Sequence, residues 1–473
     1  MKKTGNEYFD SEEFRELLAD YETSIDAGLP VFMDANELAE IADYYQMSEE
    51  YEKAEDAITL ALSLSPGAIS PLTYRIHEAL YNGDTQQAWN WLDQIVEKSE
   101  PDYIYNRAEI MIAEGKIEEA DSYLREEFKS VPPDEYQDYV IDVAHIYSDY
   151  GHNEKAMEWI IRSHSEDSPD YQELVGRTLF GLGKYKDCEQ VFKKLIDRDP
   201  FSKHYWHALA SAQFMDGDYP NAIQSSEYAI AIDPKDPDGL IAKANSLFRM
   251  NNFEEALKYY ERYSEQMPDD EFAYLYQGTC LSNLGRTKEA IDKLEKAKKM
   301  GGDQSTYYND IIPELAFVYG EDGQIDKGLA LLNETDDTDC DHVQMELAKG
   351  YLLLTADRPL EAEMHFNTAI SICDNFNEVF LRIIVSLYDN RYLETAYKLF
   401  GKYFAMVSSD NKDGYAYMAL CCYDLKRYEE FLSYLKQACE VNPTECHNVL
   451  HTLFPEGMKP ENYYEYIKNK MKS

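Results

Sequence analysis

The sequence contains no long apolar run. No segment approaches about 18 consecutive apolar residues, the length at which a transmembrane helix becomes a candidate. The N-terminal segment MKKTGNEYFDSEEF carries two lysines, but no apolar stretch follows them, so it does not resemble a secretory signal. From these two absences we expect a cytoplasmic protein that is not bound to a membrane.

Basic residues are scarce. The chain has 45 Lys and Arg against 90 Asp and Glu, a formal net charge of −45. Nucleic acids and anionic membranes are bound through cations that neutralise phosphates, so we expect neither as a partner. The acidic surface has two interpretations that remain open. It attracts a basic protein partner over long range, or it keeps an extended surface soluble.

Sequence motifs for catalysis and metal binding are missing. The eight cysteines include no C-x-x-C pair, so we expect reduced thiols on helices and neither a zinc site nor a disulfide framework. The phosphate-binding, nucleophile-elbow and zinc-protease motifs are absent as well. His204 and His207 lie three residues apart, but the sequence supplies no third ligand beside them. We therefore expect no enzyme, no metal and no cofactor.

What the chain does contain is an internal period of about 34 residues. Alignment at this spacing gives a column of small residues with Phe431 as its bulky exception: Ala54, Ala88, Ala120, Ala156, Cys188, Ala222, Ala256, Ala290, Gly328, Ala362 and Ala396. A second column precedes each of these: Ala42, Ile76, Ala108, Ala144, Gly176, Ala210, Ala244, Gly278, Ala316, Gly350, Ile384 and Ala419. Small side chains let two helices cross closely, so each period predicts a packed helical pair.

Helix-ending residues stand between and after these columns. Gly or Asn often lies between the two columns: Gly83, Gly115, Gly151, Gly183, Gly217, Asn251, Gly285 and Gly323. Proline often closes the period: Pro66, Pro132, Pro200, Pro234, Pro268 and Pro443. Gly tolerates the left-handed backbone that ends a helix, and proline cannot continue one. The period is therefore a helix, a turn and a second helix.

Residues 204–234, HYWHALASAQFMDGDYPNAIQSSEYAIAIDP, resemble a tetratricopeptide repeat. The family's motif positions hold Trp206, Leu209, Ala210, Gly217, Tyr219, Ala222, Ala229 and Pro234. Twelve such repeats fit residues 35–445, beginning near 35, 69, 101, 137, 169, 203, 237, 271, 309, 343, 377 and 412. The resemblance implies an all-α fold, a right-handed α-solenoid superhelix. We expect residues 1–34 to form an N-terminal capping helix and residues 446–473 to form C-terminal capping helices.

The resemblance also implies a ligand groove. In this family the first helix of each pair lines a concave face, where repeat positions two, five, nine, twelve and thirteen meet the ligand. Position twelve holds Phe180, Phe214 and Phe248 in repeats five to seven, and Tyr388 and Tyr423 in repeats eleven and twelve. These rings are either anchors for a peptide or part of the core between helices. Five polar groove positions accompany the phenylalanines: Arg177, His204, His207, Asn245 and Arg249.

The second position of the repeat is often acidic: Asp102, Asp138, Asp170, Asp238, Asp310, Glu378 and Asp413. An acid at the start of a helix caps free N–H groups and meets the positive end of the helix dipole. We favour this structural interpretation over ligand contact.

Together these features predict a protein-interaction scaffold or adaptor. It would bind an extended peptide or helix of a protein partner in an acidic groove that a row of aromatic rings lines. The bound segment of the partner would be basic or would be anchored by the aromatic rings. The alternative is a self-associating assembly protein, a homo-oligomer that uses its end repeats. Clasping of a partner's C-terminal carboxylate, which some tetratricopeptide domains perform, is not expected, because the paired Asn and Lys positions are not filled.

Overall fold

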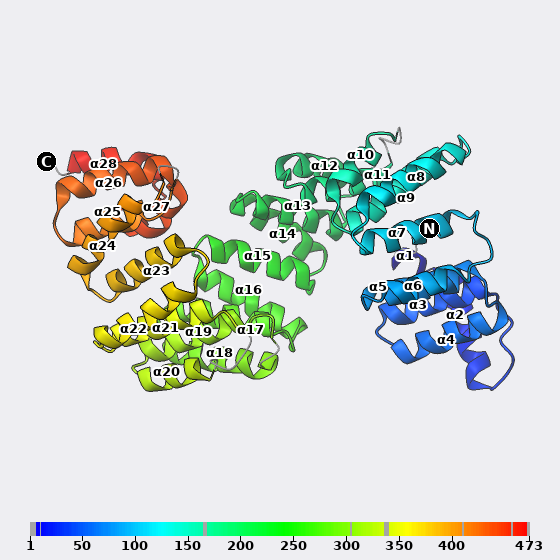
Figure 1. The fold of residues 1–473 in the computed structure, drawn as a ribbon, viewed down its shortest axis with the longest axis horizontal. Coiled ribbons are helices and arrows are strands. Elements are labelled where there is room, and N and C mark those ends of the chain that lie inside the picture. The colour runs from blue at the N-terminus through cyan, green and yellow to red at the C-terminus, as the bar shows by residue number, and fades with distance from the viewer. Residues whose placement is uncertain are drawn as a thin grey trace. The chain divides into compact units, whose positions relative to one another are not determined.

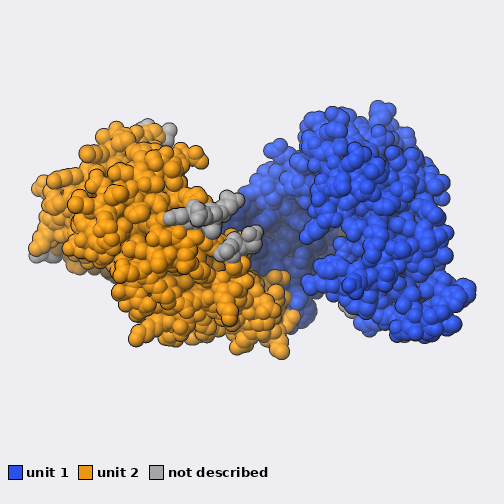
Figure 2. Space-filling view, turned by 60° about the horizontal axis from the view of Figure 1, so that its bottom comes forward, with its two compact units in different colours: residues 1–232 blue, residues 233–473 orange. Residues whose placement is uncertain are grey.

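The computed structural model describes residues 6–9, 11–163, 168–302, 305–334, 340–408, 411–455 and 457–470. These residues form α-helices and short 3-10 turns, and they contain no β-strand. No helix in this part of the chain has both the length and the apolarity needed to span a membrane. The chain divides into two compact units, residues 1–232 (unit 1) and 233–473 (unit 2), coloured separately in Figure 2.

Unit 1 is built from α1 to α14, labelled in Figure 1. Their bounds are α1 Asn6–Phe9, α2 Glu12–Asp26, α3 Ala35–Met47, α4 Tyr51–Leu64, α5 Ile69–Tyr81, α6 Thr85–Leu92, α7 Pro101–Ala113, α8 Ile117–Glu127, α9 Tyr136–Asp149, α10 Asn153–Ile160, α11 Pro169–Gly181, α12 Tyr185–Arg198, α13 Lys203–Met215 and α14 Tyr219–Ile232.

Unit 2 is built from α15 to α28. Their bounds are α15 Pro237–Arg249, α16 Phe253–Gln266, α17 Glu271–Asn283, α18 Thr287–Gly301, α19 Tyr308–Glu321, α20 Ile325–Asn333, α21 His342–Thr355, α22 Pro359–Ile372, α23 Phe376–Asp389, α24 Leu393–Met406, α25 Tyr415–Asp424, α26 Tyr428–Val441, α27 Pro443–Leu450 and α28 Tyr463–Lys470.

From α3 to α26 the helices pack as consecutive pairs, one pair for each sequence period. The first column of small residues lies at the crossing of each pair, and its alanines, Cys188 and Phe431 are at most 1% exposed. The second column is buried as well, and three of its glycines pack tightly against a large side chain of the partner helix. The predicted all-α repeat solenoid is thus confirmed, and it is built by one packing rule repeated along the chain.

The turn inside each helical pair has one residue with a left-handed backbone. Seven repeats use glycine there, such as Gly285 with φ of 71°, and an eighth uses Asn251 with φ of 58°. The other four repeats have the same backbone at residues that the sequence pattern did not single out: Glu49, Asp357, Arg391 and Lys426. A residue other than glycine pays a steric cost in this conformation, so these four turns carry local strain.

Replacing Lys426 by glycine should relieve that strain. We expect Lys426→Gly to raise the free energy of unfolding of the C-terminal repeats by about 0.5–1 kcal/mol, since its φ of 62° suits glycine. The matched reverse change is Gly285→Ala, where an added Cβ would meet no atom within 4 Å, so only the backbone opposes it. Urea unfolding of both variants checks the signs, and stabilisation by both or by neither contradicts the strain argument.

The ends of the chain are helical. In the expected N-terminal capping segment, residues 1–34, the described residues form α1 and α2, and α2 begins after Ser11, whose hydroxyl accepts a hydrogen bond from the Phe14 N–H at 3.1 Å. Phe14 and Tyr21 are buried against α3. At the other end α27 begins at Pro443, before residue 446, where the expected C-terminal capping segment begins, and α28 follows a short 3-10 turn. The first five residues and the last three lie outside the described residues.

Candidate functional site

A groove with a volume of about 600 Å³ runs along unit 2. Its lining residues come from α15, α17, α19, α21, α23 and α25, which are the first helices of six consecutive repeats. No second helix of the described pairs contributes a lining residue. Because each first helix presents the same repeat positions to the same side, the groove is a direct product of the repetition. We call it the unit 2 groove.

Five aromatic rings line the unit 2 groove: Phe248, Tyr276, Phe317, Tyr351 and Tyr417. Each is partly buried and keeps some accessible surface. Phe248 packs edge to face on Tyr276 with ring centres 5.3 Å apart, and Phe317 lies 5.2 Å from Tyr351. The rings therefore form two pairs along the groove, each contributed by successive first helices.

Carboxylates outnumber cations in the lining. Asp310, Glu314 and Asp389 line the groove, and Arg382 is its one basic lining residue among those described. The pKa of Glu314 is raised to about 7, mainly by burial and also by the nearby Glu321 carboxylate, while a hydrogen bond with the Thr279 hydroxyl opposes the shift. A cation placed beside Glu314 would therefore favour the ionised form of a carboxyl that surrounding protein holds partly protonated.

Asp389 is less enclosed. Removal of water by the surrounding protein raises its pKa to about 6, and Arg391 opposes this shift. More than a third of the Asp389 side chain is nevertheless exposed, so solvent screening weakens its interactions relative to those of Glu314. Both carboxyls, Glu314 and Asp389, therefore gain negative charge as the pH rises through their raised pKa values.

The Gln344 side chain connects Arg382 to a carbonyl of α19 that a proline leaves without its helical partner. Pro313 has no N–H, so the carbonyl oxygen of Asn309, one helical turn earlier, lacks its usual partner within the helix. The Gln344 side chain of α21 donates to this oxygen at 3.2 Å, and the Gln344 Oε1 accepts a hydrogen bond from Arg382 Nη2 at 3.2 Å. Arg382 is thus held by a neutral amide and leaves the groove carboxylates available.

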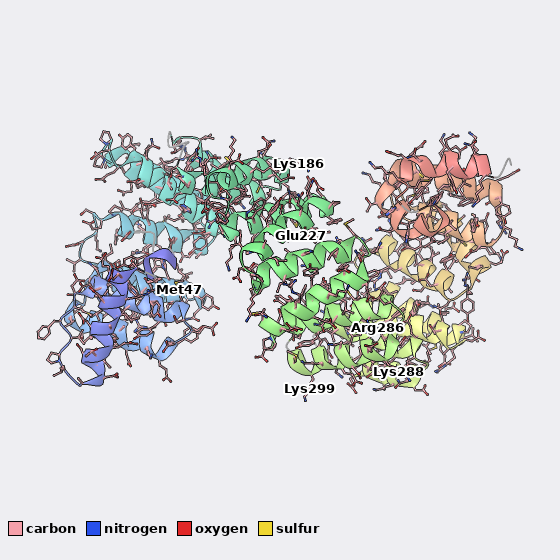
Figure 3. The ribbon with its side chains drawn as sticks, turned by 180° about the vertical axis from the view of Figure 1, so that it is seen from behind. Met47, Lys186, Glu227, Arg286, Lys288 and Lys299 are labelled. Carbon is pink, nitrogen blue, oxygen red and sulfur yellow. The ribbon has the colours of Figure 1, made fainter. Side chains whose placement is uncertain are left out.

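The lysines of unit 2 are concentrated elsewhere. The second helix α18 carries Lys288 near its beginning and Lys299 near its end, both exposed and both labelled in Figure 3. Lys298, on the same helix, pairs with Glu334 at 3.1 Å. Since second helices contribute no lining residue, these charges leave the groove acidic.

The residues singled out in repeats five and six lie on first helices of unit 1. Phe180 and Phe214 are partly buried, and each packs on the aromatic residue that begins the next helix, with ring centres 5.5 and 5.4 Å apart. Arg177 forms an ion pair with Asp149 at 2.5 Å, and His204 Nε2 lies 3.2 Å from Glu173. The rings thus stabilise the turn inside their own repeat, while Arg177 and His204 already have acidic neighbours.

The predicted residues of unit 2 divide between the groove and other contacts. Phe248 lines the groove, although it also packs on Phe253. Asn245 accepts a hydrogen bond from the Tyr260 hydroxyl at 2.7 Å, and the Tyr388 hydroxyl donates to Asp424 at 2.8 Å. Tyr423 packs edge to face on Phe431, and Arg249 is exposed. Of these five residues, only Phe248 belongs to the groove lining.

Sequence reasoning missed most of the aromatic lining. Tyr276 and Tyr417 occupy the sixth position of their repeats, and Phe317 and Tyr351 occupy the ninth. The ninth position was among those that the family resemblance implied, and its succession of Phe317 and Tyr351 was a signal available in the sequence. The sixth position is not one of the ligand positions that the family resemblance implies. Position twelve lies next to the turn, and its rings pack on the second helix of their own repeat; of Phe180, Phe214 and Phe248, only Phe248 also lines the unit 2 groove.

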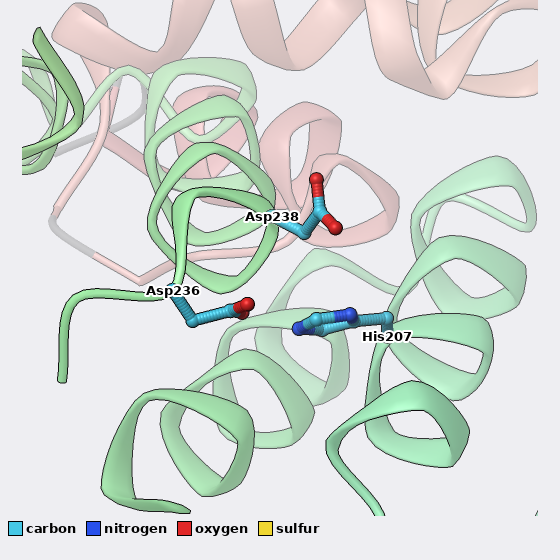
Figure 4. A group of neighbouring side chains, drawn as sticks. All are labelled: His207, Asp236 and Asp238. Carbon is cyan, nitrogen blue, oxygen red and sulfur yellow. The ribbon is translucent and has the colours of Figure 1, made fainter. Parts of the chain in front are cut away.

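Figure 4 shows Asp236 and Asp238 at the start of α15, and His207 on α13. Asp236 is the capping residue of α15, and its carboxylate accepts a hydrogen bond from the Gly239 N–H at 2.8 Å. Asp238 lies inside the first turn instead. The same holds for the other second-position acids within helices, whose capping residues are different ones: Asp102, Asp138, Asp170, Asp310 and Glu378. Asp413 precedes Gly414, the capping residue of α25. Capping was therefore the wrong interpretation for this column of acids, although those in the first turn lie near the positive end of a helix dipole.

Comparison with known families matches three segments of the chain. Residues 174–237 and residues 414–445 match models of the tetratricopeptide repeat. Residues 215–297 match the model of anaphase-promoting complex, cyclosome, subunit 3.

Two curated proteins are similar over part of their length. Protein FlbA of Caulobacter vibrioides is 28% identical over 128 residues, which cover 27% of this chain and 22% of FlbA. The human protein O-mannosyl-transferase TMTC3 is 26% identical over 152 residues, which cover 30% of this chain and 17% of TMTC3. The chain thus spans less than a quarter of either relative.

Solved structures with a similar fold are repeat proteins of low sequence identity. A tetratricopeptide repeat protein from Parabacteroides merdae is 14% identical, with a TM-score of 0.43, over 51% of this chain and 94% of that one. Cut9–Hcn1, a hetero-tetramer of APC/C, is 14% identical, with a TM-score of 0.35, over 95% of each chain.

Proposed function

Because the chain is an array of tetratricopeptide repeats, we propose that it works as a protein-interaction scaffold, with the unit 2 groove as a docking site for an extended segment of a protein partner. The observation that carries this proposal is the continuity of the lining. Six successive first helices contribute to one groove, which suits a ligand that extends along the repeats.

The chemistry of the lining favours a segment with Lys or Arg side chains. Asp310, Glu314 and Asp389 attract a cation, while the single Arg382 is occupied by Gln344. The paired rings of Phe317 and Tyr351 offer flat apolar surface to the aliphatic part of such a side chain, and a cation over an aromatic face is favourable. The acidic charge of the whole chain would speed the encounter with a basic partner.

Unit 1 contributes a separate candidate surface on α11 and α13. Phe180 and Phe214 keep accessible surface there, beside Arg177, His204 and His207. Because Arg177 and His204 are engaged with acids, we propose that the rings rather than these cations would contact a ligand. The unit 2 groove is the stronger site, because it combines aromatic surface with carboxylates.

Removing the ring pair of Phe317 and Tyr351 should strongly weaken docking in the unit 2 groove. We expect the Phe317→Ala/Tyr351→Ala variant to bind the partner at least tenfold more weakly, since central aromatic residues carry much of the energy of an interface. The matched control is Leu360→Ala/Met364→Ala, which removes two apolar side chains of α22 that are 79% and 69% exposed and outside the groove. The measurement is affinity capture from native lysate at low and high salt, followed by titration of the captured protein.

Self-association by the end repeats is the second candidate. Phe32 and Leu29, which follow α2, are 93% and 60% exposed, an unusual amount for large apolar side chains near a chain end. If capture recovers only further copies of this chain, and equally with both double variants, the groove proposal fails and self-association is favoured. A different protein retained by wild type and by the α22 control, but lost with the ring-pair variant, supports the groove.

A further inference from the structure

The C-terminal end of unit 2 brings two cysteine sulfurs into contact. Cys439 lies in the last turn of α26 and Cys446 lies within α27, with their Sγ atoms 3.4 Å apart. Asn442 connects the two helices, and its side chain caps α27 by accepting a hydrogen bond from the Glu445 N–H at 3.1 Å. The sharp turn at Asn442 therefore fixes the two thiols beside each other.

The two thiols have different environments. Cys439 is partly accessible, and its pKa is lowered by a hydrogen bond from the Cys446 thiol and by a bond from the backbone N–H of Tyr464 at the start of α28. Cys446 is completely buried, and the same contact with Cys439, together with burial, raises its pKa. Cys439 is thus the more accessible and the more acidic of the two thiols, and Cys446 is the thiol behind it.

We propose that Cys439 and Cys446 are a redox modification site, at which a hydroperoxide converts the two thiols into a reversible intramolecular disulfide. The Cys439 thiolate attacks the peroxide, the O–O bond breaks, and Cys439 becomes a sulfenic acid while water or an alcohol leaves. The Cys446 sulfur, giving up its proton, then attacks the Cys439 sulfur, and the S–O bond breaks to release water. Two thiols are oxidised, one peroxide is reduced, and a dithiol reductant reverses the step.

Burial of Cys446 does not prevent this chemistry. Its reaction partner is the oxidised sulfur already in contact with it, so no reagent needs to enter the core. Other cysteines lack this arrangement of an accessible thiol and a buried one, and burial raises the pKa of Cys188, Cys280 and Cys421 to about 12. Those thiols stay protonated and poorly reactive.

The disulfide would fasten the last helices of the array. It would join α26 to α27 across the turn at Asn442, next to the place where α28 packs on α26. There Tyr463 stacks on Phe454 with ring centres 3.7 Å apart and hydrogen-bonds with His447 at 2.9 Å. The disulfide would hold α27 against α26 and so restrict separation of these last helices. This inference does not depend on the groove.

The test treats the full-length reduced chain with hydrogen peroxide and blocks the remaining thiols with iodoacetamide. Peptide mapping should find a Cys439–Cys446 disulfide that a dithiol reductant removes, and an intact mass lower by two hydrogen atoms. Cys446→Ser should instead leave a sulfenic acid at Cys439 that dimedone traps. Cys439→Ser should give neither product, and the control Cys373→Ser, at a partly buried cysteine, should behave as wild type.

Two results would overturn the proposal. One is a chain in which Cys439 and Cys446 stay alkylatable while partly buried thiols such as Cys340 and Cys373 are oxidised. The other is a disulfide that forms without slowing hydrogen–deuterium exchange of residues 443–470, because the cap would then not be fastened. Slower exchange in the oxidised wild type, and no change after peroxide treatment of the Cys439→Ser variant, supports it.

Discussion

The Glu314→Gln/Asp389→Asn variant should bind the basic partner segment at least tenfold more weakly than the wild-type chain at pH 8, and the affinity should lose its dependence on pH. Both substitutions keep the shape of the side chain and remove its charge, and each ionised contact is worth about 1–3 kcal/mol. In the wild type, the pKa values of about 7 and about 6 mean that these carboxyls are partly protonated near neutrality. Wild-type affinity should therefore rise as the pH increases from 5.5 to 8, with release of protons on binding. Calorimetric titration at several pH values measures both effects.

Ionisation of Glu314 should strengthen binding of the partner but should lower the stability of the fold. Its pKa in the folded chain, about 7, lies above the ordinary value of 4.5, so protonation stabilises the fold. This contribution is complete below about pH 4.5 and is lost as the pH rises through about 7. Glu314→Gln removes the ionisable group and should raise the free energy of unfolding at pH 8 by about 1–2 kcal/mol, but not at pH 4.5. The control Glu254→Gln, at an exposed position on α16, should change neither binding nor stability.

A pH-independent gain in stability, or a wild-type affinity that falls as the pH rises, would contradict this account of Glu314. The first result would mean that the carboxyl is not held protonated by its surroundings. The second would mean that the groove receives an anionic or neutral segment.

The Gly350→Ala variant should lower the free energy of unfolding by about 1–3 kcal/mol, although it adds one methyl group to a helix. A Cβ at Gly350 would lie 2.2 Å from a ring carbon of Phe366, which is 5% exposed and packed between α21 and α22. The ring has little freedom to move away, so the helices must separate. Thermal and urea unfolding measure the change.

Two companion variants isolate the cause. Phe366→Leu should restore part of the stability lost in Gly350→Ala, so the double variant should be more stable than the sum of the single effects predicts. Gly401→Ala makes the same chemical change within α24, where an added Cβ would meet no atom within 4 Å. It should stabilise the chain by about 0.5–1 kcal/mol, because alanine is the better helix former. Destabilisation of equal size at Gly350 and Gly401 would show that close packing is not the reason.

The repeat architecture could be predicted from the sequence because its determinants are local. The residues of the two columns must be small wherever two helices cross. Gly350, Gly278 and Gly176 are the strictest cases, because each faces a large side chain of the other helix and leaves no room for a Cβ. The left-handed turn was visible only where glycine or asparagine occupied it. Lys426 and Arg391 adopt the same backbone because the helices on both sides impose it, and that constraint is tertiary.

The groove was harder to predict, because a repeat position fixes where a side chain starts but not what it reaches. Phe214, at position twelve, turns to Tyr219 across its own turn, whereas Phe317, at position nine, reaches the groove. Arg382 hydrogen-bonds with Gln344 of another repeat, and Gln344 in turn donates to the Asn309 carbonyl that Pro313 leaves without its helical partner. The residues that flank Arg382 in the sequence do not indicate this connection.

Photo-crosslinking in the native cell can test whether a protein partner lies in the unit 2 groove, as we propose. A benzoylphenylalanine replaces Phe317 inside the groove in one chain and Leu360 on α22 in another. We expect position 317 to capture a segment of another protein, with Lys or Arg within the cross-linked peptide, and position 360 not to capture it. Capture of that protein from position 360 alone, or cross-linking of position 317 only to further copies of this chain, would contradict the claim.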